Sequence, residues 1–434
     1  MTRFVFLALA AMAMASIASA APSVVPGRYI VQVKDTAAPA KVIAKHAVAP
    51  DFVYKSAVKG FAASIPPGKL KALGSDPDVV SIVPDRVVKA IGTVSARTKP
   101  PKNPVAAQVI PAGIARIGAS PAQSVFTGAG VGVAVVDTGI DLANADLPVA
   151  PATSSYTAYG SSAQDDEGHG THVSGIIAAR NNDIGVVGVA PGATLYAVKV
   201  LDAQGYGTDA TIMAGLDWVS ANAASVSPAI RVVNMSLGRD GSLDDNPQLR
   251  SCIQTLYQAG IVVVVAAGND ASLEVAQQVP STYPEVLAIA STTAKTGTSK
   301  YRYYPAGIGA DTASFFTTDG AFSESTGIGV TVSAPGEDQE DISRAGAISS
   351  VGILSTKLGG GTTRMSGTSM ASPHVCGVVA RFFEASAATT DVESVRGLIR
   401  ANAGAVGTAP LDSPTSIYSF DGQREGVVLV PELW

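Results

Sequence analysis

The sequence predicts an α/β protein, with a three-layer αβα body built on a parallel sheet and a small α+β domain in front of it. In the body, apolar β-branched runs alternate with helical stretches, a pattern typical of a parallel sheet that is covered on both faces. The leader instead mixes short alternating strands with two short helical stretches. The expected strands of the body lie at 131–136, 194–201, 230–235, 261–266 and 286–291, and its helices lie near 169–179, 208–224, 247–259, 369–386 and 391–401.

Composition and charge agree with a large folded protein made of two parts. Of the 434 residues, 47% are hydrophobic and 15% are charged, so a large core can form and wholesale disorder is disfavoured. Residues 21–104 hold 13 Lys and Arg against 5 Asp and Glu, a net charge of +8, whereas residues 105–434 carry a net −14. These opposite charges favour docking of the leader on the body. The acidic body gives no indication of nucleic-acid binding.

The first 20 residues have the pattern of an export signal. Arg3 gives a positive start, Phe4 to Ile17 is apolar, and Ala18-Ser19-Ala20 fits the small-x-small cleavage rule. The apolar stretch is short for a membrane span, although an uncleaved anchor remains an alternative. We therefore expect a secreted product, extracellular or periplasmic, that has no membrane attachment once the signal is removed.

Residues 21–90 predict a small domain with the order βαββαβ. The expected elements are a strand at 28–33, a helix at 37–46, strand-like stretches within 52–65, a helix at 70–73 and a last strand at 79–83, before Pro84. Residues 91–104, rich in Ser, Thr, Lys and Pro, predict an exposed linker where proteolytic cleavage is natural. The main domain is then 105–434.

Three motifs place an Asp, a His and a Ser in settings suited to nucleophilic catalysis. They are VVDTGI at 135–140, GHGTHVSG at 168–175 and GTSMASPH at 367–374. A serine hydroxyl attacks only when an imidazole takes its proton, and an acidic partner must fix the tautomer of that imidazole. Asp137 follows an apolar run, so it is expected at the carboxyl end of a buried strand, where sites in parallel sheets lie. His169 and Ser369 each stand at the start of a predicted helix.

The motifs and their chain order resemble those of the subtilisin-like serine peptidases, or subtilases, over about residues 27–400. The resemblance implies a serine endopeptidase that uses Asp137, His169 and Ser369 and passes through an acyl-enzyme. The leader resembles the inhibitory propeptide of that family, which implies a self-inhibited zymogen. The implied partners are protein or peptide substrates and the chain's own propeptide, and we expect a monomer. A dedicated processing protease and an inactive binding protein on the same fold remain alternatives.

The resemblance also implies the residues around the reacting bond. Asn269 matches the family's oxyanion asparagine, whose amide would act with the Ser369 N–H on the carbonyl oxygen. Taken alone, Asn269 would be interpreted as a turn residue after a strand. Gly205-Tyr206-Gly207 and Ser236-Leu237-Gly238 resemble the two edge strands that pair with substrate, and Ala266-Ala267-Gly268 resembles the far wall of the primary pocket. Asp209 departs from the aromatic residue common near its position, and we interpret it as a cap of the following helix.

A structural calcium ion is implied by a polar loop at 180–186. The matching ligands are the side chains of Gln108, Asp146 and Asn182 and the carbonyl groups of Arg180, Ile184 and Val186. Such a set suits Ca²⁺, which takes 6–8 oxygen ligands and accepts backbone carbonyls. An empty polar turn is the alternative.

The remaining reactive side chains are expected to be structural. His172 and His374 are interpreted as packing residues, and a metal site at His169 and His172 is disfavoured because the zinc-peptidase pattern is absent. Cys252 and Cys376 fall in helices that the resemblance places on opposite faces of the sheet, so two buried thiols are expected. The chain is longer than a compact subtilisin between Ala294 and Ser366, a stretch interpreted mainly as surface loop with one strand at 330–333.

Overall fold

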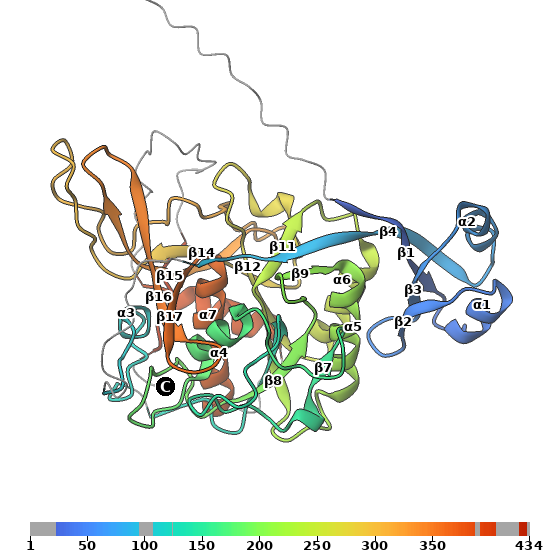
Figure 1. The fold of residues 1–434 in the computed structure, drawn as a ribbon, viewed down its shortest axis with the longest axis horizontal. Helices are drawn as coiled ribbons and strands as arrows, with labels where there is room; N and C mark the ends of the chain where they lie inside the picture. The colour runs from blue at the N-terminus through green and yellow to red at the C-terminus, as the bar shows by residue number, and fades with distance from the viewer. Residues whose placement is uncertain (1–22, 95–106, 124, 387–390, 405–424, 432–434) are drawn as a thin grey trace, which may run out of the picture.

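The computed structural model describes residues 23–94, 107–123, 125–386, 391–404 and 425–431. The expected signal sequence and residues 95–104 of the expected linker lie outside these ranges. Figure 1 shows two lobes, with a small leader lobe on the right and a larger body on the left. Strand β4 runs from the first lobe across the second.

The leader lobe is α+β, in the order βαββαβ that was predicted for it. Its elements are β1 (Val24–Val33), α1 (Pro39–Lys45), β2 (Pro50–Tyr54), β3 (Gly60–Ser64), α2 (Pro67–Gly74) and β4 (Val79–Ala90).

The body alternates strands and helices. Its first half holds β5 (Thr93–Val94), α3 (Ala112–Arg116), β6 (Gly132–Asp137), β7 (Tyr156–Thr157), α4 (His169–Ala178), β8 (Thr194–Lys199), β9 (Tyr206–Thr208), α5 (Asp209–Asn222), β10 (Ile230–Met235) and β11 (Leu237–Asp240). Its second half holds α6 (Pro247–Gln258), β12 (Val262–Ala266), β13 (Gln278–Val279), β14 (Leu287–Thr293), β15 (Val330–Ile342), β16 (Ile348–Thr356), β17 (Thr362–Ser366), α7 (Thr368–Ala385) and α8 (Val392–Ala401).

The main sheet of the body has ten strands in the order β5-β17-β16-β15-β14-β12-β10-β6-β8-β7. Neighbouring strands from β15 to β7 run parallel, which confirms the predicted α/β class. Side chains along each strand point alternately to the two faces. Val133 and Val135 enter the cluster that contains α4 and α7, whereas Ala134 and Val136 enter the cluster that contains α5 and α6. Continuous apolar strands are therefore required, because both faces are covered.

The other edge of the main sheet corrects the second half of the stretch 294–366. The strand expected at 330–333 is present but extends to Ile342, and two further strands replace the expected surface loop after it, whereas no named helix or strand lies within 295–329. Strands β15 and β16 form a long antiparallel hairpin, and β17 follows on its outer side. The acidic residues at 337–341 suggested solvent exposure, but Glu337, Asp338 and Glu340 are buried. Glu337 accepts a hydrogen bond from the Ser366 hydroxyl, and Glu340 accepts one from the Phe315 N–H. Burial raises the pKa of Glu340 to about 8.

Strand β4 also differs from prediction, because it continues through Pro84 to Ala90. Over the leader half of β4 its one partner in the sheet order is β1, so Pro84 lies on an edge strand, where a missing N–H is tolerated. Beyond Arg86 the strand pairs with β9 and β11 of the body. Ile91, expected in an exposed linker, is 7% exposed, and β5 begins two residues later.

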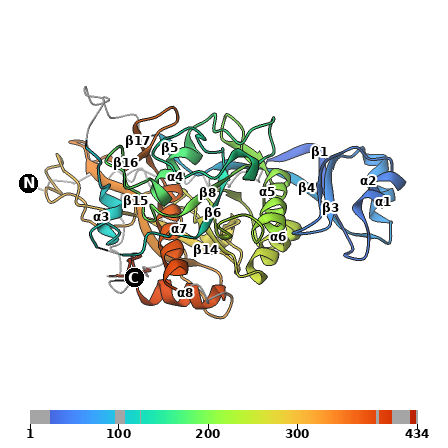
Figure 2. The same ribbon diagram turned by 90° about the horizontal axis from the view of Figure 1, so that it is seen from below.

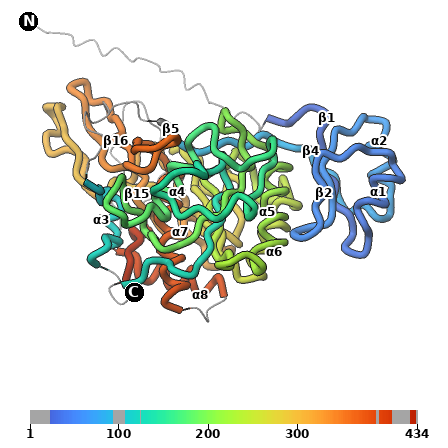
Figure 3. Tube along the Cα trace, turned by 60° about the horizontal axis from the view of Figure 1, so that its bottom comes forward, coloured from blue at the N-terminus to red at the C-terminus, as the bar shows by residue number. Residues whose placement is uncertain are grey.

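The leader lobe docks on helices α5 and α6, which lie between it and the main sheet (Figures 2 and 3). The carboxylate of Asp217 on α5 accepts the N–H groups of Lys55, Ser56 and Ala57, at 2.7–3.1 Å. The Tyr54 hydroxyl donates to the Ala210 carbonyl at 3.1 Å. The leader therefore contacts the body both through these helices and through β4.

Two further expectations can be compared with the described part of the chain. Cys252 and Cys376 are buried free thiols in separate core clusters on opposite faces of the sheet, as expected. Among the described residues, no helix is both long and apolar enough to cross a bilayer.

Candidate active site

Asp137 and His169 meet at the carboxyl end of the parallel sheet. Asp137 is the last residue of β6, and His169 is the first residue of α4. The Nδ1 atom of His169 lies 2.9 Å and 3.0 Å from the two carboxylate oxygens of Asp137, and both side chains are buried. Burial opposes a charged imidazole, but the charge and hydrogen bond of Asp137 outweigh it, so the pKa of His169 lies above its usual value. Asp137 thus orients the imidazole and stabilises its protonated form.

A glycine permits this close approach of helix to strand. Gly170 follows His169 in the first turn of α4, and a Cβ there would collide with the Gly139 carbonyl oxygen. The same Cβ would lie 3.1 Å from the Asp137 carboxylate. A larger residue would therefore push His169 away from Asp137.

Ser369 lies in the first turn of α7, where a proline changes the usual helix bonding. Pro373 has no N–H for the carbonyl of Ser369, four residues earlier. The Ser236 hydroxyl donates to that carbonyl instead, at 2.9 Å. In return, the Ser369 hydroxyl donates to the Ser236 carbonyl at 3.0 Å. The start of α7 is thereby tied to the residue that immediately precedes β11.

Asn269, three residues after the end of β12, lies beside the start of α7. Its Oδ1 accepts the Thr368 N–H at 2.9 Å and the Thr368 hydroxyl at 2.8 Å, which fixes the amide with Nδ2 toward the cleft. Nδ2 lies 3.4 Å from the carbonyl oxygen of Ile91. Gly367, at φ +149°, leaves the necessary room, because a Cβ there would lie 2.8 Å from Nδ2 and 2.9 Å from the Ile91 oxygen.

The leader chain fills the cleft in front of these groups as an extended strand. Residues Val87–Lys89 pair antiparallel with β9, and Lys89 and Ala90 pair antiparallel with β11. The Ala90 N–H donates to the Gly205 carbonyl at 2.9 Å, and the Ile91 N–H donates to the Ser236 carbonyl at 3.1 Å. The segments 205–207 and 236–238, predicted to bind substrate, therefore flank a peptide strand.

The side chains of this strand alternate between pockets and solvent. Val88 is 2% exposed within the apolar cluster of α5 and α6, and Lys89 is exposed. Ile91 packs on Gly238, where an added Cβ would lie 2.9 Å from its Cδ1 atom. The other predicted wall, 266–268, lies where β12 leads into Asn269, with the Gly268 N–H bound to the Thr368 hydroxyl.

Beyond Ile91 the chain passes close to His169 and then joins the edge of the main sheet. A Cβ on Gly92 would lie 3.0 Å from Nε2 of His169, a buried atom without a hydrogen-bond partner among the described residues. Residues Thr93 and Val94 then pair with β17 as an added edge strand. The peptide bond between Ile91 and Gly92 is thus held between Asn269 and His169.

The other two histidines of the body are structural. His172 is bonded through Nε2 to the Ile353 carbonyl, and His374 through Nδ1 to the Met370 carbonyl. Burial lowers the pKa of His172 to about 3 and that of His374 to about 4. Both are therefore neutral at ordinary pH, in agreement with the packing roles expected for them.

Asp209 does not cap α5, which corrects the sequence-based interpretation. The helix is capped by Thr208, whose hydroxyl accepts the Thr211 N–H. Asp209 is buried and receives two hydrogen bonds from Arg239, at 3.0 and 2.8 Å, and one from Asn246 at 2.8 Å. Because Asp209 follows β9 and Arg239 lies on β11, this ion pair joins the two walls of the cleft.

The predicted calcium ligands converge on one point. Nε2 of Gln108 lies 2.6 Å from the Arg180 carbonyl, 3.0 Å from the Ile184 and Val186 carbonyls and 3.3 Å from Oδ1 of Asn182. One amide nitrogen has only two hydrogens for these four oxygens. Nearby, Oδ1 of Asp146 is buried without a hydrogen-bond partner in the described structure, and burial raises the pKa of this carboxyl. An oxygen cage with an unsatisfied carboxylate fits a hard cation such as Ca²⁺, with the Gln108 amide turned by half a rotation.

Comparison with protein-family models matches residues 128–420 to the subtilase family. The chain belongs to the subtilase family. A second model, described as peptidase inhibitor I9, matches residues 28–90. This subtilase is therefore a serine endopeptidase that acts on peptides and is made as a zymogen with its own inhibitor-type propeptide.

Two subtilisins agree in sequence with the family match. Subtilisin E of Bacillus subtilis (strain 168) is 35% identical over 326 residues, which cover 74% of this subtilase and 70% of the relative. A subtilisin of Bacillus pumilus is 37% identical over 277 residues, which cover 63% and 84% of the two chains. A solved cold adapted subtilisin-like serine proteinase is 26% identical and covers 71% of this subtilase and 91% of that chain, with a TM-score of 0.49.

Two features of the subtilase site were not predicted from its sequence. One is the extended segment 87–94, for which the continuing β-branched pattern Val87-Val88 and the pair Thr93-Val94 gave a weak signal. The other is Glu167, which accepts the His169 N–H at 2.7 Å and lies two residues before that histidine. An acidic residue in a loop carries no periodic signal, so only the assembled cleft reveals its place.

Proposed function

We propose that Asp137, His169 and Ser369 form the catalytic triad of this endopeptidase. The Ser369 hydroxyl rotates from the Ser236 carbonyl to Nε2 of His169, gives up its proton and attacks the substrate carbonyl carbon. The resulting imidazolium returns that proton to the leaving amine, which departs and leaves an acyl-enzyme. Water, deprotonated by the same imidazole, then releases the acid. The 2.9 Å contact between Asp137 and His169 supports this assignment, because a buried imidazolium needs a fixed counter-charge.

We assign Asn269 and the Ser369 N–H to the oxyanion site. Negative charge develops on the carbonyl oxygen during attack, and donors held in place beforehand stabilise it most. Support comes from the Asn269 amide, whose Oδ1 is occupied by Thr368, so that Nδ2 alone is presented to the cleft. The dipole at the start of α7 acts in the same direction.

Substrates bind in this proposal as Val87–Ile91 do, as the middle strand between β9 and β11. Main-chain hydrogen bonds to 205–207 and 236–238 supply affinity, and pockets supply selectivity. The primary pocket is assigned to Gly238 and to the wall 266–268, which suits an apolar residue before the cut bond. A second apolar pocket receives the residue three positions earlier, as the burial of Val88 indicates.

We further propose that the zymogen cuts itself between Ile91 and Gly92. The observation that carries this assignment is the position of the bond, with its carbonyl oxygen 3.4 Å from Asn269 Nδ2 and its glycine against His169 Nε2. The cleaved leader would remain in the cleft and inhibit the enzyme until it is degraded or dissociates.

N-terminal sequencing of the mature protein tests this proposal, and the expected new N-terminus is Gly92-Thr93-Val94. Ile91→Asp should slow the cut strongly, because a charged residue in an apolar pocket loses its hydration. Lys89→Gln, at an exposed position of the same strand, should leave the rate of the cut nearly unchanged. A mature N-terminus elsewhere, with Ile91→Asp processed normally, would exclude this bond.

We propose Ca²⁺ as a structural ion, held by the Gln108, Asp146 and Asn182 side chains and by the carbonyls of Arg180, Ile184 and Val186. The ion would tie the loop at 180–186 to Asp146 and neutralise that carboxylate. Support comes from the converging oxygens and the unpartnered Oδ1 of Asp146.

Calcium removal should therefore lower thermal stability. An ion that binds only the folded state at a hundred times its Kd adds about 2.7 kcal/mol to the free energy of unfolding. Melting should be measured with a chelator and with millimolar calcium on the Ser369→Ala protein, which avoids autolysis. Asp146→Ala should remove most of the difference, whereas Asn181→Ala, an exposed neighbour in the same loop, should keep it. Equal melting temperatures with and without calcium would rule out the site.

Export and a monomeric enzyme complete the proposal. Export rests on Arg3, on the apolar stretch 4–17 and on Ala18-Ser19-Ala20.

A further inference from the structure

The chain between β14 and β16 builds a tip that projects from the body at the end opposite the leader lobe (Figure 1, upper left). Its two parts are the loop 299–306 and the turn between β15 and β16, 343–347. The loop runs beside the end of β15, where the Lys300 N–H donates to the Ile342 carbonyl at 2.9 Å. The ring of Tyr301 lies against the turn, since a Cβ on Gly346 would be 3.4 Å from it. Loop and turn therefore form one unit, which we call the basic tip.

The basic tip is positively charged on a body that is otherwise acidic. It holds three cations and no carboxylate, whereas residues 105–434 together carry a net −14. The cations belong to Lys300, Arg302 and Arg344. All three are exposed, and none of them forms an ion pair within the described part of the chain. Asp341, two residues before the turn, is occupied by the N–H and the hydroxyl of Thr298.

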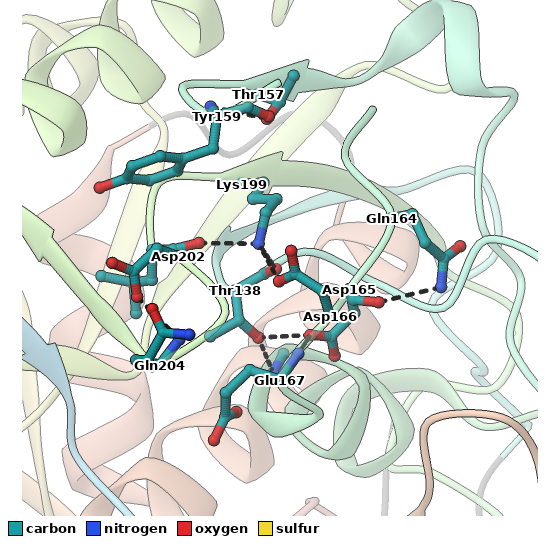
Figure 4. Close-up of polar contacts among 12 residues, drawn as sticks. Thr138, Thr157, Tyr159, Gln164, Asp165, Asp166, Glu167, Lys199, Asp202 and Gln204 are labelled. Carbon is teal, nitrogen blue, oxygen red and sulfur yellow. Dashed lines mark hydrogen bonds and ion pairs between the residues drawn. The ribbon is translucent and has the colours of Figure 1, made fainter. Parts of the chain in front are cut away.

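The opposite side of the main sheet has the opposite charge. Figure 4 shows four carboxylates near the end of β8, those of Asp165, Asp166, Glu167 and Asp202. Lys199 is the basic residue among them, and its ammonium group is bound by Asp166 at 2.6 Å. In the sheet order β8 lies toward one edge, whereas β15 and β16 lie toward the other. An anionic surface is therefore repelled at the first edge and attracted at the second, which fixes the orientation of the body against it.

Tyrosine side chains accompany the cations of the basic tip. Tyr303 is 65% exposed and Tyr304 is 38% exposed. The Cζ atom of Arg302 lies 4.3 Å from the centre of the Tyr303 ring, and Tyr301 meets that ring edge-on, with centroids 5.4 Å apart. A tyrosine has an apolar ring and a polar hydroxyl, so it suits the boundary between lipid and water, while Arg and Lys keep their charged ends among the headgroups. A projecting tip with both kinds of side chain fits a flat anionic bilayer.

The basic tip lies beyond the same end of the sheet as the candidate triad. Strand β15 runs parallel to β6 through β14, β12 and β10, and Asp137 is the last residue of β6. A surface bound at the tip would therefore lie on the carboxyl side of the sheet, where the cleft lies.

We propose that the basic tip is a peripheral docking surface for bilayers that contain anionic lipid. Its cations would bind the lipid phosphates, and its tyrosines would enter the headgroup region. Contact of this kind is reversible and salt-dependent, unlike the anchoring that a spanning helix gives. It adds a membrane contact to an enzyme for which the sequence alone predicted none. The bound enzyme would keep its cleft close to polypeptides at the lipid surface.

The test measures co-sedimentation of the mature enzyme, blocked with a serine-directed phosphonate, with lipid vesicles. The mature form is used because the basic leader would itself bind anionic vesicles. Vesicles of phosphatidylcholine with added phosphatidylglycerol should bind the enzyme more tightly than phosphatidylcholine alone, by on the order of tenfold or more at low salt. Added salt should remove most of this difference, because the charges are solvent-accessible.

Variants separate the basic tip from general charge. Arg344→Gln should weaken binding to the anionic vesicles by about fivefold, the contribution of one basic residue near such a surface. Lys357→Gln removes an exposed charge from the turn at the other end of β16 and should leave binding nearly unchanged. Tyr303→Ser should weaken binding without a change of charge. All three variants should keep the kcat/KM of the wild-type enzyme for a soluble peptide, which shows that the fold and the cleft are intact.

Equal binding to the two kinds of vesicle would overturn the proposal, as would an equal loss in Lys357→Gln and Arg344→Gln. Weaker binding in Arg344→Gln together with unchanged binding in Tyr303→Ser would also overturn it, because that result would indicate a general site for soluble polyanions instead of a bilayer contact.

Discussion

Ser369→Ala is expected to lower turnover by on the order of 10⁶-fold, because the three residues of a triad act as one unit. His169→Ala should cost nearly as much, and the double variant little more, since each change removes the same step. Turnover should be measured on a peptide whose cut bond is known. The same Ser369→Ala protein should accumulate with residues 21–91 still attached.

Ser372→Ala provides a matched control, since this buried serine of the same helix donates to Asn234 at 2.9 Å rather than facing the cleft. It should retain most of the activity and mature normally. Highly purified Ser369→Ala protein that still trims itself to Gly92, or that hydrolyses peptide well above background, would contradict the assignment of the nucleophile.

Asp209→Ala is expected to have the largest effect on stability, a loss of about 3–5 kcal/mol, because it removes the more deeply buried of the two carboxylates that bind the buried Arg239. Arg239 has a side chain only 4% exposed, and burial opposes its charge, but Asp245 and Asp209 together raise its pKa above the usual value. Urea unfolding of variants in the Ser369→Ala background measures the change without autolysis.

Asp245→Ala is the comparison for this prediction, because Asp245 binds the same guanidinium but its side chain is 15% exposed. Water can replace part of that contact, so the loss should be smaller. Asp209→Ala should also loosen the contact between β9 and β11, the two walls of the cleft. KM should therefore rise more for peptides that extend to the Val88 position than for short peptides. A stability loss below about 1 kcal/mol would show that the ion pair contributes little.

Much of the body could be predicted because burial on both faces of a parallel sheet leaves a plain signature in the sequence. The runs that end at Asp137 and Asn269 are nearly all apolar, and the small residues Gly170 and Gly367 mark places where only a glycine fits. The positions of the three catalytic candidates therefore followed from local patterns, and the structure adds the contact between Asp137 and His169.

Other features depend on contacts with residues far away in the chain and could not be predicted from local sequence patterns. Thr208 and Asp209 are both good helix caps, and the choice between them was decided by Arg239, thirty residues later. The acidic residues of β15 indicated solvent exposure. Glu337 and Glu340 are nevertheless buried, because Ser366 and Phe315 donate hydrogen bonds to their carboxylates. Pro84 suggested the end of a strand, but an edge position tolerates it.

The proposed cut between Ile91 and Gly92 would also set how the enzyme becomes active in time. While the bond is intact, the leader occupies the cleft at an effective concentration fixed by a tether of one residue, far above the millimolar values of short flexible linkers. Once the bond is cut, occupancy depends on the bulk concentration of the freed leader and on its dissociation constant. Dilution into a large volume would then activate the enzyme, whereas a small compartment with a high protein concentration would keep it inhibited. Cleavage of the bond is thus a first-order step, whereas release of the leader depends on the concentration of the protein.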